Sequence, residues 1–249
     1  MGQVFNLCVV CKSPINLQGM DDPMKNVSPT HPALVEGHAI YQKNVYDPAD
    51  YPFDIIKRST NKKLGKKVTK GRHAGLPIYT LTLEERKTCT KDCEHWDDCY
   101  GNNMPFAHRF MHGKALEDRI REDLDRLDSK HRRGYLLRLH ILGDFYSPRY
   151  VAFWEEQLSA RPGLNIYGYT RTHPGTPIGD AVAALVDKEM HRFSVRFSML
   201  PDHPFSANGE DYADPETSII CPVQTDKTDS CSTCGLCWTV NKPITFLTH

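Results

Sequence analysis

The sequence predicts an α/β fold, a small or partial (βα) barrel of the TIM-barrel type preceded by an irregular N-terminal arm. Strand-like and helix-like segments alternate along the chain from about residue 76. This alternation is typical of a parallel sheet with right-handed crossovers, and the length leaves room for about six units of roughly 30 residues. In addition, two strand patterns carry one polar face, which favours a lined cavity. An open doubly wound sheet is the alternative arrangement.

The first 75 residues lack the periodicity of helices or strands. Between residues 12 and 75 the chain is rich in Pro, Asn, Asp and Lys, with loop-like pieces such as "DDPMKNVSPTHP". We therefore predict an irregular arm over residues 1–75 and a barrel-like domain over residues 76–249. Within this arm, the basic stretch from Lys57 to Arg72 could contact a nucleic-acid backbone, or could simply be a solvated loop, since no aromatic residue interleaves it.

The later elements follow from hydrophobic period and helix caps. "LPIYTLTL" predicts a strand, and a helix is expected from about Pro105 to Leu127. Four apolar residues recur on one face of that helix: Leu116, Ile120, Leu124 and Leu127. The alternation then continues with strands over residues 135–145, 164–172 and 192–200 and with helices over residues 147–160 and 179–189. Ser147 is a favourable helix cap and Pro148 suits the first helical position.

Polar side chains share one face of two of these strands. Arg138, His140 and Asp144 fall opposite the leucines of "YLLRLHILGDF" if that strand stays regular to its end. Arg196 falls opposite the phenylalanines of "RFSVRFSML". We therefore expect Asp144, His140 and Arg196 to be the catalytic groups of a cavity. The alternatives are a core histidine, structural ion pairs and a solvated strand face.

Three further residues are expected to hold a cofactor or ligand at this cavity. Arg138 and Arg171 carry guanidinium groups, whose fixed forks can clamp a carboxylate or phosphate. Tyr169 precedes Arg171 in "YGYTRT" at the end of the same predicted strand. Arg138, Tyr169 and Arg171 are therefore the predicted cofactor-binding residues.

The C-terminal cysteines form the strongest local pattern. Cys231, Cys234 and Cys237 repeat a C-x2-C-x2-C spacing, and Cys221 is available as a fourth ligand. Thiolates three residues apart in a turn can converge on a 4Fe-4S cluster. Zinc is the alternative, although its usual spacing is two separated C-x2-C pairs.

A second cysteine group follows the first predicted strand. Cys89, Cys93 and Cys99 would then lie at the mouth of the barrel, where catalytic groups collect. Three protein thiolates on a four-iron cluster leave one iron open to a small ligand. The chain could hold one or two clusters, because all seven cysteines could instead serve one site. Cys8 and Cys11 form an isolated C-x2-C pair.

Composition argues against membrane and secreted classes. The 31 Lys and Arg residues balance the 31 Asp and Glu residues, so no net charge draws the chain toward nucleic acid or membrane. The N-terminus lacks a secretory signal, and no window approaches the roughly 18 apolar residues of a membrane span. We expect a cytoplasmic protein without a membrane partner, in which cysteines act as metal ligands rather than disulfides.

Several motifs together resemble the gene product eighty-eight family of phage and prophage proteins. They are "GLPIYTLTLEERKTCTKDCEHWDDCYGNNMPFAHR", "RLHILGDFYSPRYVAFWEEQL", "YGYTRT" and "CPVQTDKTDSCSTCGLCW". The resemblance covers nearly everything from about Gly75 onward. It implies a phage-related protein acting in a bacterial host cell, and it implies little about activity.

A wider resemblance is to radical S-adenosylmethionine enzymes. Those proteins place three cysteines after the first barrel strand, an acidic glycine-containing motif after the second and often an accessory cysteine cluster near the C-terminus. Gly143 and Asp144 match the second position here, but C-x3-C-x5-C replaces C-x3-C-x2-C and a single Gly-Asp replaces Gly-Gly-Glu. Cluster binding tolerates those changes better than S-adenosylmethionine binding does.

The sequence therefore predicts an iron–sulfur protein with redox or radical-type chemistry at a 4Fe-4S cluster at the barrel mouth. Its partner would be a small-molecule ligand or an electron donor. The alternative from another class is a structural zinc protein that docks on nucleic acid through its basic arm. A third possibility is a cluster that only staples loops together, without turnover.

Overall fold

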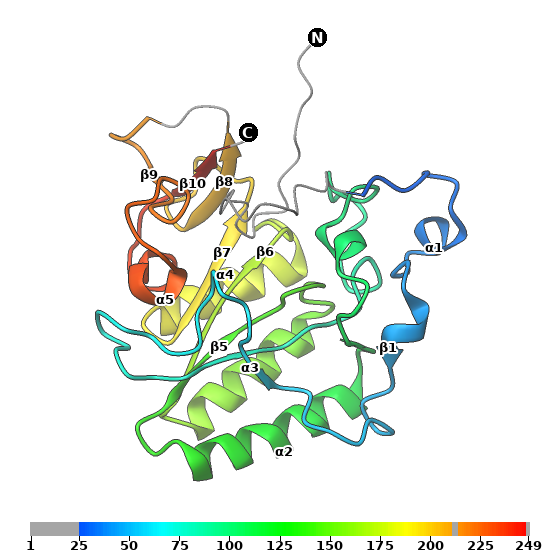
Figure 1. Ribbon diagram of the computed structural model, residues 1–249, viewed down its shortest axis with the longest axis horizontal. Coiled ribbons are helices and arrows are strands. Elements are labelled where there is room, and N and C mark those ends of the chain that lie inside the picture. The colour runs from blue at the N-terminus through cyan, green and yellow to red at the C-terminus, as the bar shows by residue number, and fades with distance from the viewer. Residues whose placement is uncertain (1–24, 211–213, 248–249) are drawn as a thin grey trace.

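The computed structural model describes residues 25–210 and 214–247, and its centre is an eight-stranded sheet (Figure 1). The strand order is β2-β3-β5-β6-β7-β8-β10-β9; β2 pairs antiparallel with β3, and every other pairing is parallel. The strands are β2 (Lys57–Arg58), β3 (Ile78–Thr80), β5 (Tyr135–Arg138), β6 (Leu164–Thr170), β7 (Phe193–Ser198), β8 (Ser206–Glu210), β9 (Ile219–Ile220) and β10 (Ile244–Leu247).

Helices and short elements connect and flank this sheet. The three long helices are α2 (Lys114–Lys130), α3 (Pro148–Ala160) and α4 (Pro177–Glu189). The short helical elements are α1 (Pro32–Val35), η1 (Gln42–Asn44), η2 (Tyr100–Asn103), α5 (Cys231–Cys234) and η3 (Leu236–Trp238). A separate two-stranded ladder pairs β1 (Val45–Tyr46) with β4 (Arg109–Phe110).

The sheet is open, because its edge strands β2 and β9 do not pair with each other. From β3 to β7 the strands follow one another in chain order, joined by α2, α3 and α4. Right-handed crossovers between sequential strands put their helices on one face of a sheet. The expected α/β alternation is therefore present, but the described residues form no closed barrel. From β3 to β8 the strands also lack the reversal of strand order that a doubly wound fold needs.

The helix-covered face holds the main hydrophobic core. Apolar residues from α2, α3 and α4 pack with alternate residues of the strands, including Leu137 of β5, Ile166 of β6 and Val195 of β7, and all of these side chains are almost fully buried. The predicted helix face of Leu116, Ile120, Leu124 and Leu127 is confirmed, since each of these residues is completely buried. Period-2 strands and period-3.6 helices thus meet as their patterns predict.

The opposite face of the sheet is covered by loops instead of helices. Two segments form this cover, the lysine-rich segment (residues 57–72) and the C-terminal segment. Leu64 and Val68 from the first and Trp238 from the second pack on Ile78 of β3 and Tyr167 of β6. The two covering segments also bind each other, because the carbonyls of Lys63 and Leu64 accept the amides of residues 231 and 232. The lysine-rich segment is therefore part of the packed fold and supports the C-terminal cysteines.

Two predicted boundaries are wrong. The helix expected from Pro105 begins only at Lys114, and η2 and β4 occupy the preceding residues. β5 ends at Arg138, well before the expected end of its strand, and Gly143 then takes a φ of 82°. Ser147 caps α3 as expected, because its Oγ accepts the amide of Tyr150.

Candidate functional site

A cavity of about 90 Å³ lies where the loops leave the carboxyl ends of the parallel strands. Cys89, Cys93 and Cys99 contribute to its wall from the loop that follows β3. The segments after β5, β6 and β7 supply other parts of the wall, including five of the predicted site residues: Arg138, His140, Asp144, Tyr169 and Arg171. The structure thus brings together eight of the residues that the sequence singled out.

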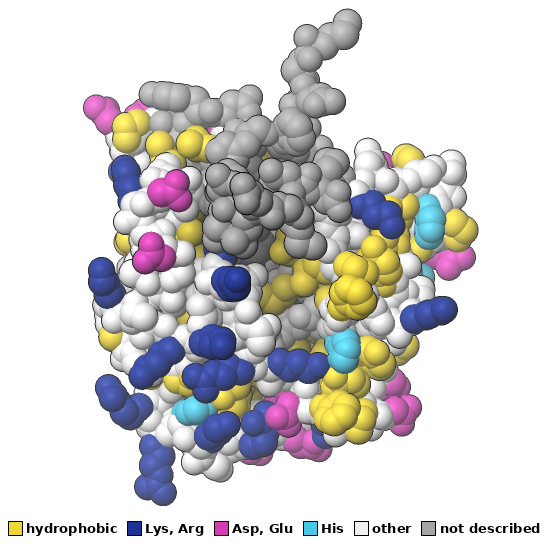
Figure 2. All heavy atoms as spheres, viewed as in Figure 1, with side chains coloured by type: hydrophobic (Ala, Val, Ile, Leu, Met, Phe, Trp, Pro, Cys, Tyr) yellow, Lys and Arg dark blue, Asp and Glu magenta, His cyan; other side chains and the backbone are white. Residues whose placement is uncertain are grey.

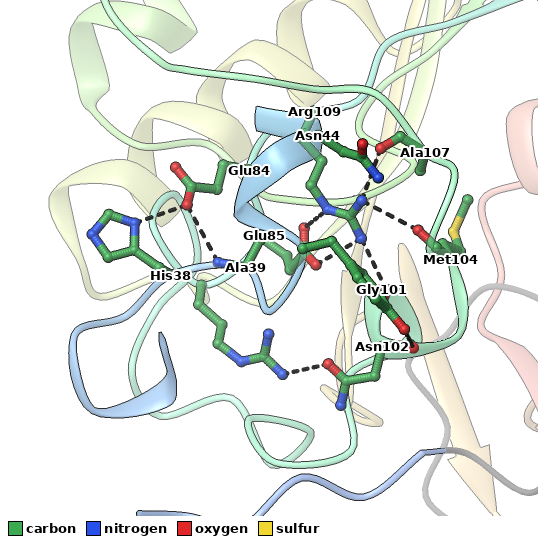
Figure 3. Close-up of polar contacts among 12 residues, drawn as sticks. His38, Ala39, Asn44, Glu84, Glu85, Gly101, Asn102, Met104, Ala107 and Arg109 are labelled. Atoms are coloured by element: carbon green, nitrogen blue, oxygen red, sulfur yellow. Dashed lines mark hydrogen bonds and ion pairs between the residues drawn. The ribbon is translucent and has the colours of Figure 1, made fainter. Parts of the chain in front are cut away.

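A buried ion pair anchors the loop that carries these cysteines (Figure 3). The Arg109 guanidinium donates to both carboxylate oxygens of Glu85, at 2.6 and 3.0 Å, and both side chains are almost completely inaccessible. It also donates to the carbonyls of Gly101, Met104 and Ala107. One guanidinium therefore holds the chain just beyond Cys99 against the start of the loop.

Further hydrogen bonds join parts of the same loop to each other and tie the loop to the segment before residue 45. Arg86 donates to the carbonyl of Trp96 and to the Asn102 side chain, each at 2.8 Å. Glu84 accepts from the backbone amide of Ala39 and from the ring of His38 (Figure 3). The cysteine loop thus has a defined shape that its polar network maintains without a disulfide.

The Gly-Asp motif shapes the floor of the cavity. A Cβ on Gly143 would lie 2.5 Å from the Thr88 hydroxyl oxygen, and its φ of 82° disfavours other residues. Asp144 accepts hydrogen bonds from the amides of Phe145 and Arg171, and its own amide donates to Thr88. Burial raises the pKa of Asp144 to about 6, although these hydrogen bonds oppose the shift. Asp144 therefore joins the cysteine loop to the ends of β5 and β6.

The three thiols of this cavity favour their protonated form. Burial raises the pKa of Cys89 and of Cys93, and raises that of Cys99 to about 12. The carboxylates of Asp144 and Glu85 add to this effect, because a nearby negative charge disfavours thiolates. A cation bound among these thiols would favour their thiolate form, and thiolates are preferred ligands of zinc and of iron–sulfur clusters.

The remaining wall of the cavity is basic and aromatic. The Arg138 guanidinium lies 4.6 Å from the centre of the Tyr169 ring, and Arg138 Nη2 is buried without a hydrogen-bond partner among the described residues. Arg171 makes an ion pair with Glu94 at 2.9 Å. Arg138 therefore keeps a buried donor for an acceptor that enters the cavity.

His140 lies in the cavity wall but also belongs to the helix-side core. Its Nε2 lies 3.2 Å from the Tyr150 hydroxyl, and its ring packs against Phe145. Burial lowers the pKa of His140 to about 3, so the ring is neutral at physiological pH. Its Nδ1 is buried and lacks a partner in the described part of the chain. His140 is therefore both a core residue, through its contacts with Tyr150 and Phe145, and a residue of the cavity wall.

The four C-terminal cysteines surround a second, smaller cavity of about 10 Å³. Cys221 follows β9, Cys231 and Cys234 form the ends of α5, and Cys237 lies in η3. Gly235 ends α5 in the left-handed conformation, with a φ of 71°, and so turns the chain back toward Cys237. The seven cysteines therefore line two cavities instead of one.

Arg196 belongs to this second region and does not line the first cavity. Its guanidinium is fully buried and donates to the carbonyls of Cys237, Val240 and Lys242. Arg196 is therefore not part of the cavity that Asp144 and His140 line, because it points from β7 into the C-terminal segment and holds its backbone. The period-2 pattern predicts the face of β7 that carries Arg196, but it does not show which segment covers that face.

Tyr169 lies between the two cysteine regions. It lines the first cavity, packs with the apolar cluster that contains Cys231 and Cys234, and its hydroxyl hydrogen-bonds the Cys237 thiol. The two regions thus share one aromatic side chain from the end of β6.

In the described residues, the two cysteine groups are not arranged around a single metal-ion position. Among the described residues, no three His, Cys, Asp or Glu side chains converge as a single metal ion requires. Four thiolates around one zinc ion would have sulfurs about 3.8 Å apart, given Zn–S bonds of about 2.3 Å. Among the described residues, the cysteines of the two cavities thus do not form a ready-made site for one ion.

Sequence reasoning missed several residues of this region. Glu85 and Glu94 line the first cavity, and Arg109 fixes its loop. Acidic residues interleaved with the cysteines in "KTCTKDCEHW" were an available signal. The sequence did not predict that Arg109 is the partner of Glu85, because Arg109 lies beyond the third cysteine and outside this motif. Cys8 and Cys11 lie outside the described residues.

The lysine-rich segment is exposed on the surface in Figure 2, where Lys and Arg side chains gather on one side of a central hollow. Lys62, Lys66, Lys67 and Lys70 are exposed, and no Asp or Glu occurs between residues 57 and 72. Within residues 25–210 and 214–247, no helix has both the length and the hydrophobicity needed to cross a bilayer.

Comparison with known proteins finds similarity to two phage proteins. It is 26% identical over 136 residues to the Gene 88 protein of Mycobacterium phage L5, which is 45% of this chain and 54% of that protein. It is 27% identical over 143 residues to the Gene 88 protein of Mycobacterium phage D29, covering 48% and 57% of the two chains. The chain thus spans about half the length of these relatives, and no solved structure matches it.

The family match covers both cysteine regions and the sheet between them. The profile of the Gene product 88 family matches residues 55–240, which begin ahead of β2 and end just after η3. This chain therefore belongs to the Gene product 88 family.

Proposed function

We propose that this protein binds an iron–sulfur cluster at the cavity lined by Cys89, Cys93 and Cys99 and performs redox or radical-type chemistry there. The observation that supports it best is that three partly buried thiols from one loop surround one cavity at the carboxyl edge of a parallel sheet. A four-iron cluster held by three thiolates keeps one iron available to a small ligand. Arg138 and Asp144 would position that ligand, and Arg171 would neutralise its charge.

The second cysteine group would hold a further cluster through four thiolates. Cys221, Cys231, Cys234 and Cys237 surround their own cavity, and Arg196 fixes the backbone around Cys237. A site with four protein ligands has no open iron, so this cluster would transfer electrons or stabilise the fold. The reducing cytoplasm of a host cell would keep all seven thiols available.

Anaerobic purification tests both sites. The unaltered protein should be brown, absorb near 400 nm and contain iron and acid-labile sulfide in equal amounts. A Cys89→Ser/Cys93→Ser/Cys99→Ser variant and a Cys231→Ser/Cys234→Ser/Cys237→Ser variant should each retain about half of the iron. Cys8→Ser/Cys11→Ser is the matched control and should retain all of it. A colourless protein with stoichiometric zinc would overturn the proposal.

The alternative proposal is a structural zinc protein that docks on nucleic acid. The exposed lysines between residues 62 and 70 favour it, because no carboxylate lies within that stretch. Binding to duplex DNA should then weaken steeply as salt rises. A Lys62→Ala/Lys66→Ala/Lys67→Ala variant should lose binding, while Lys87→Ala/Lys91→Ala/Lys114→Ala, which changes exposed lysines elsewhere, should not. Absence of DNA binding at low salt would exclude this alternative.

A further inference from the structure

A groove of about 350 Å³ opens beside the cysteine cavity and is separate from it. One wall is formed by residues 57–61, which include the edge strand β2, and the other by residues 104–110. Figure 2 shows the central hollow of this face, with basic side chains on one side and hydrophobic side chains on the other. The volume is within the range of about 300–1,000 Å³ that is typical of small-molecule sites.

The groove is electropositive. Among the described residues that line it, none is acidic, whereas Lys57 and Arg58 are cationic. Lys57 Nζ donates to the Tyr51 hydroxyl at 2.7 Å and lies 3.1 Å from His108 Nδ1. No ion pair involves Lys57 or Arg58 within the described part of the chain. The lysine ammonium is therefore held in place by neutral groups, which leaves its charge available to an anion.

Ser59 supplies a buried group that lacks a partner. Ser59 is one of the residues that line the groove, and it is only 2% exposed. Its amide donates to the carbonyl of Ile78, so the backbone is fixed, but its buried Oγ has no hydrogen-bond partner among the described residues. An unsatisfied buried hydroxyl costs about 1–3 kcal/mol, and a ligand oxygen would satisfy it. Ser59 thus marks the position of a polar ligand group beside the two cations.

The opposite wall offers an apolar, aromatic surface. Phe106 is 90% exposed, which is unusual for a phenylalanine, and Met104 lies beside it in the groove lining. Exposed aromatic rings next to cationic side chains are the combination on which nucleobases stack. A sugar phosphate would leave this wall uncovered, so the groove is better matched to an anion that carries a planar ring.

We infer that this groove binds a nucleotide unit, either as a free nucleotide or within a single strand. Lys57, Arg58 and Ser59 would hold the phosphate, and Phe106 would stack on the base. Ile141 lines both the groove and the cysteine cavity, so a bound nucleotide would lie next to the proposed metal site. The inference does not require a metal, because none of the seven cysteines lines the groove.

Calorimetric titration with dTMP, thymidine, ribose 5-phosphate, inorganic phosphate and a ten-residue oligothymidylate tests this inference. dTMP should bind with a dissociation constant below about 1 mM and more tightly than the three fragments that lack either the base or the phosphate. Tighter binding of the oligonucleotide than of dTMP would identify a single strand as the source of the nucleotide. Equal or tighter binding of dTMP would identify the free nucleotide.

Matched variants locate the binding. Phe106→Ala and Arg58→Ala should each weaken dTMP binding about five-fold or more, because stacking and phosphate contacts are lost. Their controls are Phe53→Ala and Arg133→Ala, which change an exposed phenylalanine and an exposed arginine outside the groove. Ser59→Ala should weaken binding without loss of folding, since it removes only the hydroxyl.

Three outcomes would overturn the inference. They are no heat or displacement signal with any nucleotide up to about 10 mM, equal affinity for dTMP and inorganic phosphate, and equal losses in the control variants. The Cys89→Ser/Cys93→Ser/Cys99→Ser variant should bind dTMP normally. Loss of iron in that variant and loss of nucleotide in Phe106→Ala are separate results, so the metal proposal and the groove can fail independently.

Discussion

Glu85 and Arg109 show how single residues define the candidate site. The fully buried guanidinium joins one carboxylate and three carbonyls of the cysteine loop, so the loop depends on a charge pair that water does not reach. Gly101 adds to this dependence, because a Cβ there would lie 2.4 Å from Glu85 Oε1. The cysteine loop therefore has little freedom to adopt another shape.

Glu85→Gln should destabilise the protein by about 3–5 kcal/mol, because it leaves the Arg109 charge buried without a counter-ion. Urea unfolding of the metal-free protein measures this free energy. Glu94→Gln is the matched control, since it removes the partner of Arg171 at the protein surface and should cost about 1 kcal/mol or less. Similar small losses in both variants would contradict the anchoring role of Glu85.

At the scale of elements, local signals predicted helices best where a cap agrees with the hydrophobic period. α3 begins where Ser147 and Pro148 predict, and α4 also begins with a threonine cap followed by a proline. α2 lacks a side-chain cap, because Gly113 with a φ of 124° precedes it. The residues just before α2 are instead held by tertiary contacts. Arg109 forms the buried ion pair with Glu85, and β4 pairs with β1, so the helix begins only after them.

Ser147→Ala should destabilise the protein by about 1 kcal/mol, because the amide of Tyr150 loses its side-chain acceptor. Ser159→Ala changes an exposed serine near the end of the same helix and should have little effect. Thermal and urea unfolding of the two variants, side by side, give the difference. An equal loss in Ser159→Ala would show that the cap does not set the stability of α3.

At the scale of the whole molecule, loops take the place that helices would occupy in a doubly wound sheet. Helices α2, α3 and α4 cover one face, while Leu64, Val68 and Trp238 seal the other. The two cysteine regions lie at separate places on this frame, and Tyr169 and Met199 contribute to both. The same cover buries polar side chains. Arg138 lies at the end of β5 and His140 lies two residues beyond it, and both are almost fully buried.

Acid should weaken the folded state through His140. Its pKa is about 3 in the folded protein and about 6.5 when unfolded, so the unfolded chain binds the extra proton between these values. The stability that the neutral ring contributes is complete above pH 6.5 and falls as pH drops toward 3. Asp144, whose pKa burial raises, has the opposite slope. The His140 contribution must therefore be measured as a difference between variants.

The difference in unfolding free energy between the unaltered protein and His140→Gln should fall by about 2–3 kcal/mol from pH 6.5 to pH 4.5. Urea unfolding of metal-free protein at both pH values gives this number, and Asp144 cancels in the comparison. His31→Gln, which changes an exposed histidine, should show no such change. A constant difference for His140→Gln would mean that its ring is solvated in the folded protein.

The sequence by itself determined the α/β alternation, the buried face of α2, the start of α3 and the grouping of Cys89, Cys93 and Cys99 with Asp144 at one edge of the sheet. These features depend on period, caps and the shared edge of parallel strands, which are local or follow from topology. Only the tertiary structure decided that the sheet stays open, that Arg196 binds the C-terminal backbone and that the seven cysteines divide between two cavities. Those features depend on which loop covers the polar face, and contacts between distant segments leave no period in the sequence.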